Sequence, residues 1–224
     1  TAREQVAALI DAEPDEIIFT SGGTESDNAA IGSAITMEPR RGHFVTVKTE
    51  HSAVLETSRR WMEYGRPVSE VGVDPGGRVR LDDLRGATQA GQTALVSVMW
   101  ANNEVGTVQP VAEIAQIARE RGVPMHSDAV QAVGQLELSF AASGVDCLTV
   151  SGHKIGGPVG VGALIARRGL QLTSVLHGGG QERAIRSGTL DAASITAMAA
   201  AAQAAITELG EGSADRLAAL RDTL

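Results

Sequence analysis

Short β-branched runs alternate with longer amphipathic runs along most of the chain, and this alternation restricts the possible folds more than any other feature. The short runs, each about five residues long, predict strands at Glu16–Thr20, Phe44–Lys48, Val68–Val73, Ala94–Met99, Pro124–Ser127, Cys147–Ser151 and Gly162–Ala166. The longer runs between them predict helices at Ser26–Met37, Ala53–Tyr64, Val111–Arg121 and Ser194–Leu209. This order is typical of α/β proteins in which helices cover both faces of a mostly parallel central sheet. Ligands of such folds bind beyond the carboxyl ends of the strands.

Composition excludes several classes of protein. Apolar residues make up 43% of the 224 residues, enough for a sizeable buried core. A net charge of -8 argues against a nucleic-acid-binding function. The longest apolar stretches are about six residues, far short of the ~20 that span a bilayer, so no membrane partner is expected. A single cysteine, Cys147, excludes an internal disulfide and fits a reducing compartment, so a cytoplasmic location is expected.

Both ends of the chain carry apolar residues at helical spacing, over Ala2–Ala12 and Ser213–Leu224. Complete domains more often end in polar tails. We therefore interpret the chain as an internal piece of a longer protein, with a compact protein that has helical termini as the alternative.

Lys154 is the most informative residue, because it follows a predicted strand and precedes a glycine-rich turn. Lysine is scarce, since the sequence holds only Lys48 and Lys154. Arginine does not deprotonate and cannot act as an amine nucleophile, whereas a lysine can form an imine with a carbonyl compound. The alternative is an ordinary loop lysine.

The segment from Thr20 to Asn28 runs from a predicted strand through Gly22 and Gly23 into a predicted helix. Backbone N–H groups at such a helix start can bind an anion, although a plain Ser or Thr cap is the alternative. Neither a Walker pattern nor a dinucleotide-binding fingerprint occurs in the sequence.

Three further segments place polar side chains directly after predicted strands. Asp128 could face a protonated pyridine nitrogen or could cap the next helix. His51 could stack on a ring and move protons, or could be a capping or surface histidine. Asn102 and Asn103 could hydrogen-bond a cofactor oxygen or simply form a turn. A zinc site built from histidines and Cys147 is disfavoured because the short ligand spacing of structural zinc sites is absent.

Six segments occur in one order along the chain: SGGTESDN, TEHSAVL, ANNEVG, HSDAVQAVG, SGHKIGGPVGVGAL and GGGQERAIRSGT. Together they closely resemble the pyridoxal-phosphate-dependent cysteine desulfurases of the NifS/IscS type, in the class V aminotransferase group. The resemblance runs from Thr1 to Leu224. It implies the large cofactor-binding domain of a fold type I transferase over residues 1–209. Residues 210–224 then begin the helix that leads to a small C-terminal domain.

The resemblance also implies roles for individual residues toward pyridoxal 5'-phosphate. Lys154 corresponds to the lysine that condenses with the cofactor and later acts as acid and base at the substrate α-carbon. Asp128 corresponds to the partner of the ring nitrogen, and His51 to the imidazole that stacks on the ring and can relay protons. The remaining implied cofactor contacts are Gly23, Thr24, Asn103, Gln131, Ser151, His153 and Thr189. Of these, Thr189 corresponds to a residue that reaches the phosphate in a neighbouring subunit.

The activity implied by the resemblance is removal of sulfur from L-cysteine, which leaves L-alanine and a protein persulfide. A homodimer with shared active sites and a sulfur-acceptor scaffold protein are the implied partners. In the family the persulfide-forming cysteine lies on a loop well after the RSGT segment. Cys147 matches no such position, and we predict it to be a core residue. We therefore expect the chain alone to bind the cofactor without turning over cysteine. The alternatives are a selenocysteine lyase, a class V aminotransferase or a non-catalytic cofactor-binding scaffold.

Overall fold

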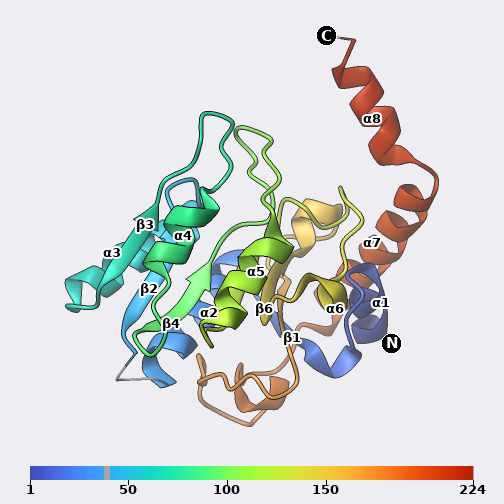
Figure 1. Ribbon diagram of the computed structural model, residues 1–224. Helices are drawn as coiled ribbons and strands as arrows, with labels where there is room; N and C mark the ends of the chain where they lie inside the picture. Colours follow the sequence, from blue (N-terminus) through green and yellow to red (C-terminus); the bar gives the residue numbers. More distant parts are fainter. Residues whose placement is uncertain (38–40, 224) are drawn as a thin grey trace.

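A seven-stranded sheet forms the central layer of the molecule (Figure 1). The computed structural model of the chain describes residues 1–37 and 41–223. The strands are β1 (Ile17–Thr20), β2 (His43–Val47), β3 (Val68–Val71), β4 (Thr93–Ser97), β5 (Met125–Asp128), β6 (Cys147–Ser151) and β7 (Gly162–Ala166), in the spatial order β1-β7-β6-β5-β4-β2-β3. Strands β2 to β6 pair in parallel, while β7 runs antiparallel to both β1 and β6. The predicted mostly parallel sheet is confirmed.

Helices cover both faces of the sheet, as the sequence predicted. On one face lie α2 (Gly23–Met37) and α3 (Ser52–Glu63), which share a core cluster with β2 and β4. On the other face the main core cluster joins α1 (Ala2–Leu9), α4 (Leu81–Ala87), α5 (Val111–Glu120), α6 (Phe140–Ser143) and α7 (Ala192–Gly210) to the sheet. Short 3-10 helices lie at Pro14–Glu16, Gly152–Ile155 and Glu182–Ala184.

Helix α7 is long and apolar enough, by length and composition alone, to cross a membrane. Its apolar character comes largely from alanine, and it packs against α1. Ile195, Met198 and Ala199 are among its residues that are buried in the main core cluster. In this structure α7 is therefore a core helix of the sheet's second face.

Helix α8 (Ser213–Arg221) follows α7 and extends away from the body of the molecule (Figure 1). None of its residues is buried, and Leu217 and Leu220 are more than half exposed. The helix starts close to residue 210, where we predicted a change of domain, and that domain boundary stays a prediction.

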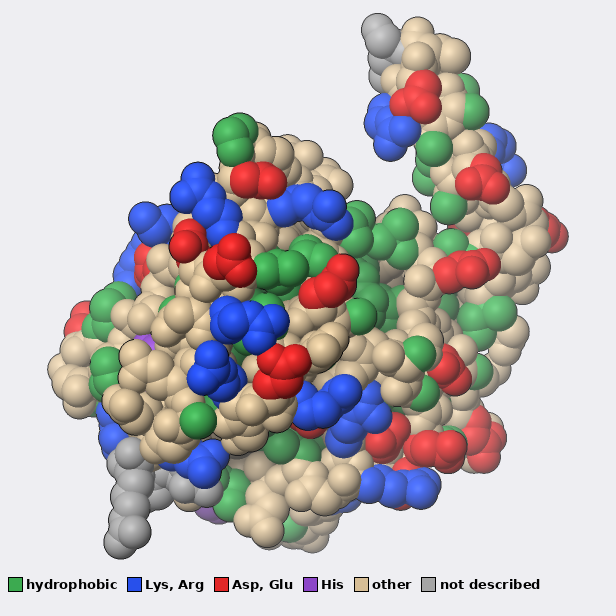
Figure 2. Space-filling model, viewed as in Figure 1, with side chains coloured by type: hydrophobic (Ala, Val, Ile, Leu, Met, Phe, Trp, Pro, Cys, Tyr) green, Lys and Arg blue, Asp and Glu red, His purple; other side chains and the backbone are tan. Residues whose placement is uncertain are grey.

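On the face of the molecule drawn in Figure 2, basic and acidic side chains lie interspersed. Ion pairs also join neighbouring helices: Arg85 Nη1 on α4 and Glu120 Oε2 on α5 are 2.6 Å apart. Exposed pairs of this kind contribute little to stability, about 0–1 kcal/mol each.

The parallel direction of β2, β4, β5 and β6 brings their carboxyl ends to one edge of the sheet. Asp128 is the last residue of β5, and the segments that follow β2, β4 and β6 carry His51, Asn103 and Lys154. The topology thus gathers side chains that are far apart in the sequence.

Candidate active site

A cavity of about 240 Å³ opens at the carboxyl edge of the sheet. It is lined by Gly23, Thr24, Asp27, His51, Met99, Asn103, Asp128, Val130, Gln131, Ser151, His153 and Lys154. Nine of the ten site residues predicted from the sequence are in this set, and Thr189 is not. Asp27, Met99 and Val130 were not predicted. A signal for Asp27 exists in the sequence, because it lies one helical turn after Gly23 and so shares its helix face.

The loop of residues 20–25, called the glycine loop here, forms one wall of the cavity. Gly22 has a φ of +147°, and its carbonyl accepts hydrogen bonds from the Thr20 hydroxyl and from the N–H and hydroxyl of Ser26. Among the described residues, the N–H groups of Gly23, Thr24 and Glu25 have no acceptor. Three unpaired donors at a helix start, together with the helix dipole, favour an anion there.

Glycine at position 23 keeps the cavity open. A Cβ atom there would lie 3.1 Å from Val130 Cγ2 and 3.9 Å from Ser151 Cβ. A side chain at position 23 would therefore crowd the space between the glycine loop and the opposite wall.

Gly162 on β7 packs closely against the glycine loop, and we expect Gly162→Ala to displace that loop. A Cβ at this position would lie 2.7 Å from both Gly22 Cα and Val150 O, which are backbone atoms that cannot turn away. We expect a loss of about 1–3 kcal/mol in the free energy of unfolding, as for other overpacked core sites, and weaker binding of inorganic phosphate at the loop.

Gly32→Ala is the matched control, because no atom lies within 4 Å of a Cβ added at that position of α2. It should raise stability by about 0.5–1 kcal/mol, since alanine favours helix more than glycine does. Urea unfolding of both variants checks the pair. Equal effects of the two substitutions would show that the close approach of Gly162 to the loop is unimportant.

His51 caps a helix, as one of its two predicted roles requires, while its stacking and proton-transfer role stays a prediction. Its Nδ1 accepts the N–H of Ala53 at 3.1 Å, so the side chain caps α3. The same imidazole lines the cavity. Because Nδ1 is an acceptor, the neutral ring carries its proton on Nε2.

The two asparagines after β4 differ in role. Asn102 is structural: its Oδ1 accepts the N–H groups of Glu104 and Val105, and its Nδ2 donates to the Thr49 carbonyl at 2.8 Å. Asn103 is exposed and lines the cavity. The turn interpretation thus fits Asn102, and the cavity position belongs to Asn103.

Asp128 is the last residue of β5 and is 5% exposed. A turn follows it rather than a helix, and its Oδ1 accepts the Val130 N–H at 2.9 Å. Burial raises the pKa of Asp128, while this hydrogen bond and the charges of His51 and Lys154 partly offset the rise. A buried acid of this kind suits a cationic partner in the cavity.

Lys154 sits in the 3-10 turn directly after β6, at the rim of the cavity. It is an exposed residue that lines the same cavity as Asp128, and its charge lowers the pKa of Asp128. Beside it, the Ser151 hydroxyl and His153 Nδ1 are hydrogen-bonded at 2.9 Å. The arrangement places one amine, one buried acid and a set of hydrogen-bond donors around a single space.

Thr189 lies in a separate cavity of about 130 Å³, together with Ser21 and Arg186. Arg186 Nε donates to Glu25 Oε1 at 2.9 Å, and Glu25 Oε2 accepts the Ser21 N–H at 2.9 Å. The segment that carries Thr189 is therefore tied to the outer side of the glycine loop. The role of Thr189 toward a neighbouring subunit stays a prediction.

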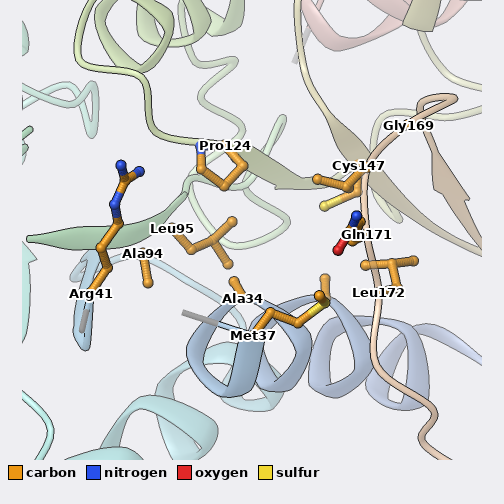
Figure 3. A pocket seen from close by; sticks show the side chains of 12 residues that line it. Ala34, Met37, Arg41, Ala94, Leu95, Pro124, Cys147, Gly169, Gln171 and Leu172 are labelled. Carbon is orange, nitrogen blue, oxygen red and sulfur yellow. The ribbon is translucent and has the colours of Figure 1, made fainter. Parts of the chain in front are cut away.

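A larger cavity, of about 420 Å³, lies at the opposite edge of the sheet (Figure 3). Apolar side chains such as Leu95 and Leu172 make up much of its wall, with Arg41 as its one charged lining residue in the described part of the chain. Cys147 also lines it and is 1% exposed. Burial raises the pKa of the Cys147 thiol well above its usual range, so the predicted core role of this residue is confirmed.

Comparison with known proteins agrees with this geometry. The model of the class V aminotransferase family matches residues 1–219. An IscS-like cysteine desulfurase from Mycobacterium tuberculosis is 52% identical over 100% of this chain, and a cysteine desulfurase from Nostoc is 46% identical over 100% of it. The chain spans 58% and 56% of the length of these two relatives.

Solved structures show the same fold. A NifS-like protein superimposes with a TM-score of 0.88 at 40% identity, covering 94% of this chain and 58% of that one. A structure described as SspA in complex with cysteine gives a TM-score of 0.86 at 35% identity, over 90% of this chain and 59% of that one. The sheet is thus that of fold type I, and the chain belongs to the class V aminotransferase family, within which it is similar to the NifS/IscS-type cysteine desulfurases.

Proposed function

We propose that this chain forms the cofactor-binding part of a pyridoxal-phosphate-dependent cysteine desulfurase. The observation that carries the proposal is the meeting of Lys154, Asp128 and the glycine loop around one cavity. Membership of a family that depends on pyridoxal phosphate supports the choice of cofactor. The 52% identity to an IscS-like cysteine desulfurase supports the choice of reaction.

The residues around the cavity fit this cofactor. Lys154 offers an amine for the aldehyde, and Asp128 offers a buried carboxylate for a protonated ring nitrogen. The unpaired N–H groups of the glycine loop, with Ser151 and His153, offer donors for the phosphate. His51 would lie against the ring, and Asn103 and Gln131 would form hydrogen bonds with its polar substituents. When bound, pyridoxal phosphate supplies an electron-accepting ring that stabilises negative charge at the α-carbon of an amino acid.

The chain's own residues then hold and move protons. Lys154 Nζ would take the α-proton of L-cysteine and later return a proton on the way to L-alanine. Asp128 keeps its negative charge and so holds a proton on the ring nitrogen. His51 Nε2 is the imidazole nitrogen available for proton exchange, because Nδ1 is occupied by the Ala53 N–H.

The sulfur-accepting thiol comes from outside these 224 residues. A thiolate is the required nucleophile, and the one cysteine of the sequence, Cys147, is buried with a raised pKa. In this proposal the protein works as a cytoplasmic homodimer in which Thr189 serves the neighbouring site. The sulfur passes from the persulfide to an acceptor scaffold protein.

The proposal is tested by following the α-proton of L-cysteine. Chain 1–224, loaded with pyridoxal phosphate, is mixed with L-cysteine in D₂O and observed by proton NMR. We expect loss of the α-proton signal through exchange with solvent, and no release of sulfide or alanine. Absence of exchange with cofactor bound would contradict the role of Lys154, and steady sulfide release would contradict the external origin of the thiol.

A further inference from the structure

Three carboxyl groups from separate parts of the chain are buried together at the cavity wall and behind it. Asp27 on α2, Glu50 after β2 and Asp128 on β5 are 1%, 6% and 5% exposed. Asp27 and Asp128 line the same cavity, and Glu50 Oε1 accepts the N–H of Met99, which also lines it. The negative charge of Asp128 raises the pKa of both Asp27 and Glu50. Within residues 1–37 and 41–223, none of the three forms an ion pair with a lysine or arginine. We call these three groups the carboxyl cluster.

Two oxygen atoms of the carboxyl cluster lack hydrogen-bond partners. Among the described residues, Asp27 Oδ1 and Glu50 Oε2 are buried without a donor, whereas Glu50 Oε1 accepts the Met99 N–H at 2.7 Å. An ionised carboxylate that is buried without partners is strongly unfavourable. A protonated carboxyl carries no net charge, so its burial costs far less.

The imidazole beside Asp27 supplies no positive charge. His126 Nε2 lies 3.5 Å from Asp27 Oδ1, and the imidazole is fully buried between the hydroxyls of Ser97 and Thr149. Burial lowers the pKa of His126 to about 3, so the ring is neutral near pH 7. The Cys147 thiol is buried with a raised pKa and adds no positive charge. The Thr149 hydroxyl lowers the pKa of Asp27 only in part.

Asp128 differs from the other two members in what it faces. The charges of His51 and Lys154 lower its pKa, as does the hydrogen bond from the Val130 N–H. Glu50 receives backbone hydrogen bonds but lies next to the charge of Asp128, and burial raises its pKa well above the usual range. Groups in one cluster whose surroundings differ in this way take different charges.

We propose that Asp27 and Glu50 are held as neutral carboxylic acids, so that the carboxyl cluster carries one negative charge, on Asp128. Asp27 is then a positioning residue. As a neutral acid it occupies the cavity wall without adding a second negative charge that would repel the charge of Asp128. This inference concerns the ligand-free chain and goes beyond the proposed function. Where the proposed function also holds, the single charge matches one protonated ring nitrogen.

Infrared spectroscopy of the ligand-free wild-type chain tests the proposal directly. In D₂O at about pH 7.5, exposed carboxyls are ionised, so a C=O stretching band of protonated carboxyls reports buried acids. We expect such a band in the wild type and a weaker one in both Asp27→Asn and Glu50→Gln. No band in the wild type, or an undiminished band in both variants, would overturn the proposal.

The pH dependence of stability provides a second measurement. A raised pKa in the folded state means that the unfolded chain binds fewer protons between about pH 4 and that pKa, so stability falls as pH rises. Asn cannot ionise, and Asp27→Asn removes this loss. We therefore expect the Tm of Asp27→Asn minus that of wild type to increase from about pH 5 to about pH 8.

Asp82→Asn, on the exposed face of α4, controls for the substitution itself. A Tm difference for Asp27→Asn that stays constant or falls with pH would contradict the proposal, because a purely structural role gives no upward trend. Both measurements use the ligand-free chain. Failure of this inference therefore leaves cofactor binding at Lys154 standing, and failure of cofactor binding leaves the charge assignment standing.

Discussion

Lys154→Ala is expected to abolish covalent attachment of pyridoxal phosphate to the chain completely. Alanine has no amine, and Lys154 is the one lysine at the cavity among the described residues. The measurement is reduction of the loaded chain with borohydride, followed by peptide mass spectrometry. The wild type should carry the cofactor mass on the peptide that contains Lys154, and the variant should carry none.

Lys48→Ala is the matched control, since Lys48 is the only other lysine of the sequence and does not line the cavity. It should leave the label on Lys154 unchanged. A label on Lys48 or on the amino group of Thr1 in the wild type would contradict the assignment of Lys154. The phosphate donors of the glycine loop remain in Lys154→Ala, so weaker, non-covalent retention of the cofactor by that variant is compatible with it.

Glu182→Ala is expected to lower the free energy of unfolding by about 3–5 kcal/mol, the range for breaking a buried ion pair. The Glu182 side chain is 2% exposed and accepts from Arg3 Nη2 at 2.6 Å and from Arg3 Nη1 at 3.1 Å. It also accepts the Phe19 N–H at 2.7 Å. Alanine would remove the acceptor of this amide and the carboxylate partner of the guanidinium, which would keep its hydrogen bond to the Ile17 carbonyl. Urea unfolding measures the loss.

The same substitution should loosen the turn that contains Glu182. Glu182, Arg183 and Ala184 have φ values of 47°, 60° and 59°, a left-handed conformation that costs non-glycine residues roughly 1–2 kcal/mol each. Glu208→Ala on the exposed side of α7 is the control and should change stability by less than about 0.5 kcal/mol. A loss below about 1 kcal/mol in the free energy of unfolding of Glu182→Ala would contradict a stabilising role for its contacts with Arg3 and Phe19.

The strands and long helices could be predicted because their apolar patterns are strong and local. Glu16–Thr20 and Cys147–Ser151, for example, correspond to β1 and β6 to within one residue. Helices α4 and α6 were missed, because at seven and four residues they are too short to show a helical period. Val68–Val73 was predicted two residues too long, since β3 ends at Val71 and Val73 forms only an isolated bridge to Val79.

The cavity could be predicted in part, because its strand-end residues follow from the parallel topology. Asp27 could not be placed so easily, since its contact with His126 depends on how α2 packs against β5. The pairing of Arg3 with Glu182 joins residues 179 positions apart and leaves no local pattern in the sequence. Thr189 follows an irregular segment with left-handed residues, and no periodicity fixes where such a segment runs.

Strand β6 sets a distance with a chemical consequence. Cys147 begins the strand at the edge with the larger cavity, and Ser151 ends it beside Lys154. Four residue steps along a strand span about 13 Å, more than any cysteine side chain can bridge. Under the proposed function, sulfur released at Lys154 therefore lies beyond the reach of Cys147, and turnover requires a second thiol that can move to and from the cavity.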